Sequence, residues 1–274
     1  MSIVTLQHLL AEKERLFVLT GAGISAESGI PTYRDHRGNW QRSNPIQHSE
    51  FIHRLDKRQR YWARSLVGWE YVARAQPNFV HFELARWEAE GFVNILVTQN
   101  VDSLHQKAGS KNVVELHGAM SDVVCMHCAD ISSRAALQPR LRSENPSLAS
   151  FVAKALPDGD ADIDDFDMSA VTVPDCEKCG GMLKPDVVFF GDNVPKERVD
   201  STYQALENSD LLLVIGSSLQ VFSGYRFCKR AVELGIPIAC INQGDTRADG
   251  LFDVKVSLTA SEALMQLNLT ERVS

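Results

Sequence analysis

The sequence predicts an α/β fold, in which a Rossmann-like open parallel sheet carries a small inserted domain. Apolar runs typical of buried strands alternate with helical segments along most of the chain. A glycine-rich turn at residues 21–29 directly follows the first such run, residues 15–20. Residues 119–183 differ in composition, because two Cys-x-x-Cys pairs flank a long polar insertion there. These pairs predict that the inserted domain binds zinc.

The composition is that of a globular protein without a nucleic-acid or membrane partner. The 274 residues suffice for one large or two unequal domains. The 28 Lys and Arg residues against 35 Asp and Glu residues give a net charge of −7, which disfavours the nucleic-acid backbone as the main partner. No run reaches the roughly 18 apolar residues of a membrane-spanning helix, and the N-terminus lacks the basic region of a signal peptide. We therefore expect a cytoplasmic protein.

The expected strands and helices follow one another in the order of a parallel α/β sheet. Strands are expected at residues 15–20, 92–97, 112–118, 186–190, 210–215, 236–241 and 254–256. Helices are expected from the N-terminus to about residue 15, over 79–90, 196–208 and 223–234, and from about residue 260, with short helices within 37–76. In the 79–90 helix, Phe79, Phe82 and the run 84–87 supply the apolar face.

The change in composition sets the expected domain boundaries. The Rossmann-like domain would comprise residues 1–36, 78–118 and 184–274. The small domain would comprise a helical part, residues 37–77, and a zinc module, residues 119–183.

The glycine turn has the pattern of a dinucleotide-binding site. Gly21, Gly23 and Ala26 fit G-x-G-x-x-G/A, in which glycines let the backbone approach a pyrophosphate at a helix N-terminus. The spacing alone fits an ordinary strand-to-helix turn equally well. Pro31 would end the helix early, and residues 41–50 lack the strand that an oxidoreductase needs for the ribose. The pattern therefore favours a dinucleotide site that performs chemistry other than hydride transfer.

The cysteine pairs predict one structural zinc ion. Cys125 and Cys128 form the first pair, Cys176 and Cys179 form the second, and 47 residues (129–175) separate the pairs. Two such knuckles complete a tetrahedral site, and four thiolates leave no open coordination position. Free thiols or a redox pair are the alternatives. His127 could replace one cysteine, but within C-x-x-C it is expected to be a bystander.

The polar insertion contains an acidic segment, residues 157–167, with six aspartates. A calcium-binding loop needs Gly where Ile163 stands and Glu where Ser169 stands. We therefore expect a solvated acidic loop.

Three polar residues at strand ends are candidates for catalysis. His117 follows a short strand on the ligand side of the sheet and could act as a base. A histidine satisfied by backbone hydrogen bonds is the alternative. Asn100 and Asp102 could hold a carboxamide and ribose hydroxyls, or they could cap the helical turn at 103–107.

Motifs distributed over nearly the whole chain, in the family's order, resemble those of the sirtuins, the NAD-dependent protein lysine deacylases. The motifs are Gly21–Ser25, Gly29–Pro31, Thr98–Asp102, Leu116–Gly118, the two cysteine pairs, Lys184–Gly191, Gly216–Leu219 and Asn242–Gly244. Residues 61–64, 67–69, 156–160 and 223–227 resemble the class II branch, which contains the fourth human sirtuin.

The resemblance implies which residues bind the cofactor and the substrate. The implied NAD contacts are Gly21, Ala22, Gly23, Ser25, Tyr33, Arg34, Gln99, Asn100, Asp102, Gly216, Ser217, Ser218, Asn242, Gln243, Gly244 and Ala260. Residues 187–191 and 219–224 would sandwich an acyl-lysine peptide as an added strand. His117 would be the general base, with Asn100 and Asp102 in the catalytic pocket.

The implied reaction transfers the acyl group of an acyl-lysine protein or peptide to ADP-ribose. It releases nicotinamide, O-acyl-ADP-ribose and free lysine, and the enzyme is expected to be a monomer. A mono-ADP-ribosyltransferase with the same site is one alternative. A non-catalytic NAD or ADP-ribose sensor is another, although His117 and Asn100 argue against it because a sensor needs neither.

Three features depart from the common family pattern or leave a choice open. Thr32 stands where Asp is usual, and Tyr33 stands where Phe is commoner. Tyr61 and Arg64 form a Y-x-x-R pair, which some sirtuins use to bind acidic acyl groups. A pair that packs within a helix is the alternative.

Overall fold

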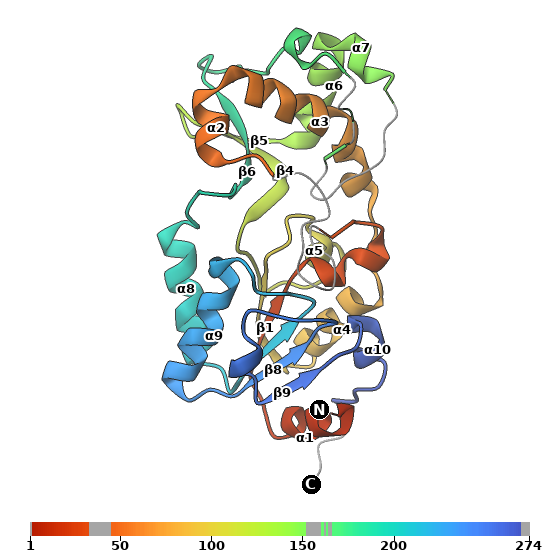
Figure 1. The fold of residues 1–274 in the computed structure, drawn as a ribbon, viewed down its shortest axis with the longest axis vertical. Coiled ribbons are helices and arrows are strands. Elements are labelled where there is room, and N and C mark those ends of the chain that lie inside the picture. The colour runs from red at the N-terminus through yellow and green to blue at the C-terminus, as the bar shows by residue number, and fades with distance from the viewer. Residues whose placement is uncertain (1, 33–44, 152–159, 162, 164–165, 270–274) are drawn as a thin grey trace.

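The computed structural model describes residues 2–32, 45–151, 160–161, 163 and 166–269. These residues form two parts that lie one above the other along the long axis of the molecule (Figure 1). The lower part contains a six-stranded sheet with helices on both sides, and the upper part contains a three-stranded sheet with its own helices.

The large sheet confirms the predicted open parallel architecture. Its strand order is β3-β2-β1-β7-β8-β9, and every neighbouring pair is parallel. The strands are β1 (Leu16–Thr20), β2 (Val93–Thr98), β3 (Val113–Glu115), β7 (Leu211–Ile215), β8 (Ile238–Ile241) and β9 (Val254–Val256). The order of the strands reverses between β1 and β7, which is where ligands bind in sheets of this type.

Helices cover both faces of this sheet, so its central strands are buried on both sides. One face packs against α1 (Ile3–Ala11), α4 (Phe79–Ala89) and α10 (Ala260–Leu264). The other face packs against α8 (Lys196–Glu207) and α9 (Phe222–Leu234). Side chains of β1 alternate between the two cores, as the period of a strand requires: Leu16 and Val18 enter the first core, and Phe17 and Leu19 enter the second.

The apolar face predicted for the 79–90 helix was right at Leu84 and Trp87, which are buried, but wrong at Phe79 and Phe82, which are 39% and 54% exposed. Val80 completes the buried face, because positions 80, 84 and 87 form one i, i+4, i+7 stripe that faces the sheet.

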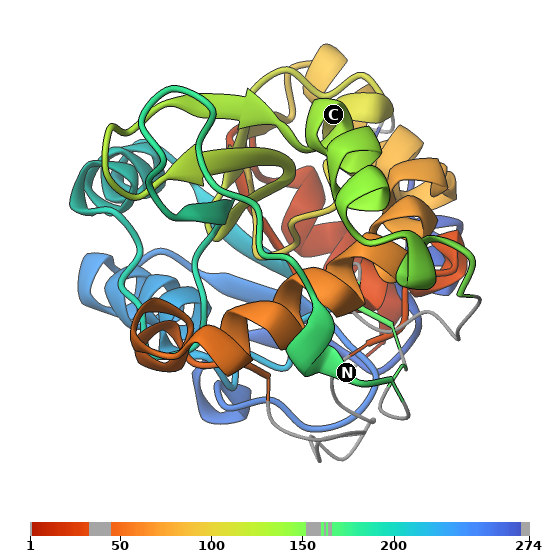
Figure 2. The same cartoon turned by 90° about the horizontal axis from the view of Figure 1, so that it is seen from above.

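The upper part contains a sheet that the sequence did not predict. Strands β5, β4 and β6 are antiparallel in that order, and the helices around them form a separate apolar core (Figure 2). The elements are α2 (His48–His53), α3 (Leu55–Arg74), β4 (Gly118–Cys125), β5 (Ile131–Ser133), α6 (Arg134–Glu144), α7 (Pro146–Ala149), η4 (Met168–Ala170) and β6 (Leu183–Val187). The short helices expected within 37–76 are replaced, among the residues described, by α2 and the 20-residue α3. The strand expected at 186–190 runs instead from 183 to 187.

Two histidines lie against each other in the core behind the glycine turn. His81 of α4 and His105 of α5 (Leu104–Lys107) are 0% and 1% exposed, and their ring centroids are 4.9 Å apart. His105 Nε2 is 3.1 Å from Thr20 Oγ1 at the end of β1. Burial lowers the pKa of His81 to about 4 and lowers the pKa of His105 well below its ordinary value. Both rings are therefore neutral in the folded protein near pH 7.

None of the helices in the described ranges combines the length and apolar character needed to cross a bilayer.

We predict that the free energy of unfolding falls as the pH is lowered from about 6.5 towards 4. The unfolded chain takes up a proton at His81 near pH 6.5, whereas the folded protein does so only near pH 4, so stability is complete above this window and is lost within it. The loss from His81 is on the order of 3 kcal/mol. Urea unfolding of wild type and His81→Gln across this range should show a shallower pH dependence for the variant. Substitution of the exposed His8 by Gln is the control, and equal slopes for wild type and His81→Gln would contradict the prediction.

Candidate active site

The ends of β1 and β7 meet through glycines at the switch point of the sheet. Gly21 N donates a hydrogen bond to Ile215 O at 3.1 Å, and Gly23 N donates to Gly216 O at 2.9 Å. A Cβ added at Gly23 would lie 2.8 Å from Gly216 O, so only glycine fits this approach. The turn continues as two 3₁₀ turns, η1 (Ala22–Ile24) and η2 (Ala26–Ser28), whereas an α-helix was expected. The second turn ends at Gly29, whose φ is +83°.

A buried polar cluster joins this turn to the carboxyl end of β2. Asn100 Nδ2 donates to Gly21 O at 3.2 Å and to Ser25 Oγ at 3.0 Å. Ser25 Oγ donates to one carboxylate oxygen of Asp102 at 2.7 Å, and Leu104 N donates to the other at 2.9 Å. Asp102 therefore caps α5, as the alternative interpretation proposed, and also belongs to the predicted pocket. Burial raises the pKa of Asp102, while these two hydrogen bonds act in the opposite direction.

His117 is held between two segments with one nitrogen available as a base. Its Nδ1 is 2.9 Å from the backbone carbonyl of Gln99, and its Nε2 is 2.7 Å from Ser223 Oγ. A carbonyl oxygen only accepts, so Nδ1 carries the proton and Nε2 presents a lone pair to the Ser223 hydroxyl. Burial lowers the pKa of His117, the hydrogen bond to Gln99 raises it, and the charges of Arg198 and Arg226 lower it further. The imidazole is consequently neutral near pH 7.

Gln99 links three of the predicted site elements. Its side-chain carbonyl accepts a 2.6 Å hydrogen bond from Ser217, just beyond β7. Its amide nitrogen would lie 2.6 Å from a Cβ added at Gly224, so the first turn of α9 packs directly on it. His117 donates to the backbone carbonyl of Gln99, and Asn100 is the next residue in the chain. Asn100 and His117 therefore lie at the same edge of the sheet.

The two segments expected to hold the substrate flank His117. Val188 N donates to the backbone carbonyl of His117 at 2.8 Å, and Ser223 contacts its ring. The sequence interpretation placed Ser223 and Gly224 in the segment expected to bind the peptide, but it did not predict the contacts of Ser223 with His117 or of Gly224 with Gln99. Residues 223–227 resemble the class II branch of the sirtuins, but this resemblance does not indicate what Ser223 and Gly224 contact.

The remaining predicted NAD residues lie beyond β7 and β8 or at the start of α10. Ser218 O accepts from Arg247 N at 2.9 Å, and Asn242 N donates to Val256 O at 3.1 Å. Gln243 accepts from the Asn242 side chain through its backbone carbonyl, and Gly244 accepts from Lys255 through its own. Ala260 is the first residue of α10, behind the N-cap Thr259. Ala22 begins η1, whereas Tyr33 and Arg34 lie outside the described residues.

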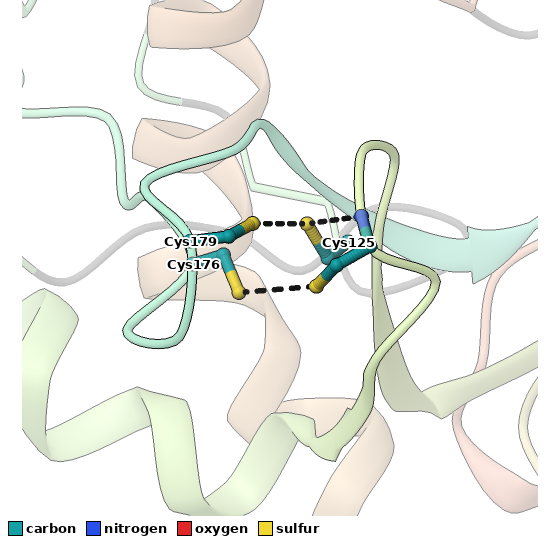
Figure 3. A group of neighbouring side chains, drawn as sticks. Cys125, Cys176 and Cys179 are labelled. Carbon is teal, nitrogen blue, oxygen red and sulfur yellow. Dashed lines mark hydrogen bonds between the residues drawn. The ribbon is translucent and has the colours of Figure 1, made fainter.

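The four cysteines of the two pairs form a single cluster in the upper part. Their sulfur atoms all lie within 4.8 Å of one another, with Cys125–Cys179 at 3.6 Å and Cys128–Cys176 at 3.8 Å (Figure 3). Zinc–sulfur bonds of about 2.3 Å in a tetrahedron place sulfurs about 3.8 Å apart, so the cluster fits Zn²⁺. His127 does not belong to the cluster, as expected. The backbone N–H groups of Cys128 and His127 donate to the Cys125 sulfur and lower its pKa, which favours the thiolate.

The Tyr61 and Arg64 side chains are engaged within the upper part. Arg64 is 8% exposed and donates two hydrogen bonds, of 2.5 and 2.9 Å, to the carboxylate of Asp160. The ring of Tyr61 packs on Phe51 and Phe189. These contacts favour the packing interpretation. The acidic segment is also not wholly solvated, because Asp160 is paired and its neighbour Ala161 is buried.

Comparison with known proteins decides the family. The Sir2 family model matches residues 21–223, most of the chain. The chain belongs to the Sir2 family. It is 51% identical over 262 residues to an NAD-dependent protein deacetylase of Bordetella bronchiseptica, covering 96% of each chain. It is 46% identical to the Bos taurus NAD-dependent protein lipoamidase sirtuin-4, mitochondrial, covering 94% of this chain and 83% of that protein.

The fold of this sirtuin agrees with solved family members. A structure of Sir2 with a p53 peptide and NAD⁺ superposes with a TM-score of 0.76 at 27% identity and covers 97% of each chain. The predicted family is thereby confirmed, and the sirtuin-4 relative supports the class II-like branch.

We predict that Gly216→Ala weakens NAD binding about tenfold or more. Gly216 has φ +62°, and an added Cβ would lie 2.8 Å from Ile24 N, so the glycine turn would have to move. Titration calorimetry with NAD measures the effect. Gly250→Ala is the matched control, because its Cβ would meet nothing within 4 Å. Equal NAD affinity for Gly216→Ala and wild type would contradict the prediction.

We predict that Cys176→Ser removes the bound zinc and lowers the free energy of unfolding by more than about 2 kcal/mol, because a serine hydroxyl replaces one of four thiolates. Zinc content by atomic absorption and thermal unfolding measure both effects. Cys228→Ala, on the buried face of α9, should keep the zinc content of wild type. A Cys176→Ser protein that retains zinc would show that the cluster is not the metal site.

Proposed function

We propose that this sirtuin is an NAD-dependent protein lysine deacylase that transfers the acyl group of acyl-lysine to ADP-ribose. The observation that carries the proposal is the position of His117. Its unprotonated Nε2 lies 2.7 Å from Ser223 Oγ, between the two segments expected to hold a peptide, and its Nδ1 is fixed by the backbone carbonyl of Gln99, the residue before Asn100.

In this proposal, separate residues bind NAD, bind the peptide and accept the proton. The glycines at the ends of β1 and β7 admit the pyrophosphate close to the backbone, and Asn100 and Asp102 line the nicotinamide pocket. When bound, NAD supplies the ribose carbon that accepts the acyl oxygen as nicotinamide leaves. His117 Nε2 takes the proton from a ribose hydroxyl, and Gln99 holds the ring in the tautomer that leaves Nε2 free. The 187–191 and 219–224 segments bind the peptide backbone as an added strand.

The zinc site has a structural role in this proposal. Four thiolates fill a tetrahedral ion and leave no position for a reactant. A cytoplasmic location and a monomeric state remain predictions from the sequence.

We predict that His117→Ala folds like wild type but loses about 10²- to 10⁴-fold in turnover, since a positioned general base contributes that range. Nicotinamide release should be measured against a panel of acyl-lysine peptides, with circular dichroism to compare folding. Wild-type activity should also decline as the pH falls through the lowered pKa of His117, because the protonated ring is not a base.

Ser110→Ala, at a buried position after α5, is the control and should retain turnover. Near-normal turnover by His117→Ala would refute the role of the histidine. Transfer of label from the NAD adenylate onto protein, without loss of acyl-lysine, would support the ADP-ribosyltransferase alternative.

A further inference from the structure

An aromatic and basic surface, exposed at Phe222 and Arg247 and half-buried at Tyr225 and Arg226, adjoins the proposed peptide-binding segment. It comprises Phe222, Tyr225, Arg226 and Arg247, which we call the Phe222 patch. Phe222 is 50% exposed although it begins α9, directly before the Ser223 that contacts His117. A half-exposed aromatic ring, one residue from the serine that contacts His117, offers apolar area to a ligand.

The two arginines of the patch are stacked on its rings. The guanidinium of Arg226 lies 5.3 Å from the Phe222 ring centroid, and that of Arg247 lies 4.5 Å from the Tyr225 ring. Arg247 is also held by a hydrogen bond to Gln220 O at 3.2 Å. Stacking fixes the guanidinium planes while their edges remain able to donate hydrogen bonds.

Neither arginine forms an ion pair with a carboxylate within the ranges that the structure describes. Among the described residues, Arg226 Nε is buried and has no hydrogen-bond partner, and Arg247 donates to the backbone carbonyls of Gln220 and Ser218. Most other arginines of the lower part are paired, as Arg15 is with Asp210 and Arg230 with Glu207. Arg226 and Arg247 thus have no carboxylate partner in the described part of the chain although the chain carries a net charge of −7, which indicates that a negatively charged group of a ligand pairs with them.

We propose that the Phe222 patch binds an acidic side chain of the substrate, within a few residues of the acyl-lysine. This inference rests on the proposed deacylase function and names the substrate class of that site. An extended peptide advances about 3.3 Å per residue, and Phe222 adjoins Ser223 in the segment expected to hold the peptide, so we place the acidic residue two or three positions from the acyl-lysine. The guanidinium edges pair with a carboxylate, and the Phe222 ring packs on the stem of the same side chain.

The test compares acyl-lysine peptides that differ in one residue. Glu, Gln or Lys is placed in turn at each of the three positions on either side of the acyl-lysine, and kcat/KM is measured with saturating NAD. We expect a Glu peptide to exceed its Gln counterpart about fivefold or more at one or two positions, with the difference falling at high salt. Arg226→Gln and Arg247→Gln should each reduce the Glu/Gln ratio, and Arg247→Glu should reverse it in favour of Lys.

Arg15→Gln is the matched control, because it removes one arginine at the opposite end of β1 and should keep the Glu/Gln ratio of wild type. Equal kcat/KM for Glu and Gln peptides at every position, or a ratio unchanged in both arginine variants, would overturn the proposal. If no acyl-lysine peptide turns over, the deacylase function fails. Binding of a labelled Glu peptide, measured by fluorescence anisotropy, then still tests the patch. The proposal requires that wild type binds this peptide and that Arg247→Glu abolishes the binding.

Discussion

The backbone of Gln99, at the carboxyl end of β2, is the point on which the whole site depends. Its N–H donates to Thr20 O at the end of β1, and its carbonyl accepts from His117. Its side chain accepts from Ser217 beyond β7. One residue thus sets the spacing between the glycine turn, the histidine and the β7 loop. Because the main chain of Gln99 makes two of these contacts, they depend on the parallel register of β2 with β1 and with β3.

The two parts of the molecule meet where the substrate would enter. β4 begins at Gly118, directly after His117, and β6 ends at Val187, directly before Val188, which bonds to His117 O. The zinc cluster lies at the far end of this same strand pair, since β4 ends at Cys125. A metal bound there would fix the end of β4 opposite to His117, a structural role that needs no open coordination position.

The parallel sheet and the cysteine cluster could be predicted from the sequence, because both depend on local patterns. Runs such as Leu211–Ile215 are too apolar for anything but a buried strand, and each C-x-x-C pair encodes its own turn. β4 was missed because its partners β5 and β6 lie in different parts of the chain and Ser121 and Asp122 interrupt its apolar pattern. α3 was divided into shorter helices because Arg64 and Ser65 are polar residues on its buried side.

The candidate site was foreseeable in its residue types but not in its contacts. His117, Asn100 and Asp102 each follow a strand, and their shared sheet edge follows from parallel topology alone. Ser223 contacts His117 and Gly224 packs on Gln99. Both contacts depend on how α9 packs after a loop in which Leu219 has φ +54°. Such tertiary contacts leave no periodic signal in the sequence.

The two core histidines, His81 and His105, differ from His117, the proposed base, in burial and in hydrogen bonding. His81 and His105 are buried with ring nitrogens, His81 Nε2 and His105 Nδ1, that lack partners, and burial lowers the pKa of both. His117 is also subject to burial, but a carbonyl fixes its proton on Nδ1 and a mobile hydroxyl meets Nε2. A hydroxyl contact is exchangeable for another hydroxyl at the same distance, such as that of a ribose. The Nε2 atoms of His105 and His117 both meet a hydroxyl, but His105 is 1% exposed whereas His117 is only partly buried. In the proposed mechanism His117 is therefore distinguished by its access to a ligand and not by its pKa, which burial lowers in all three histidines.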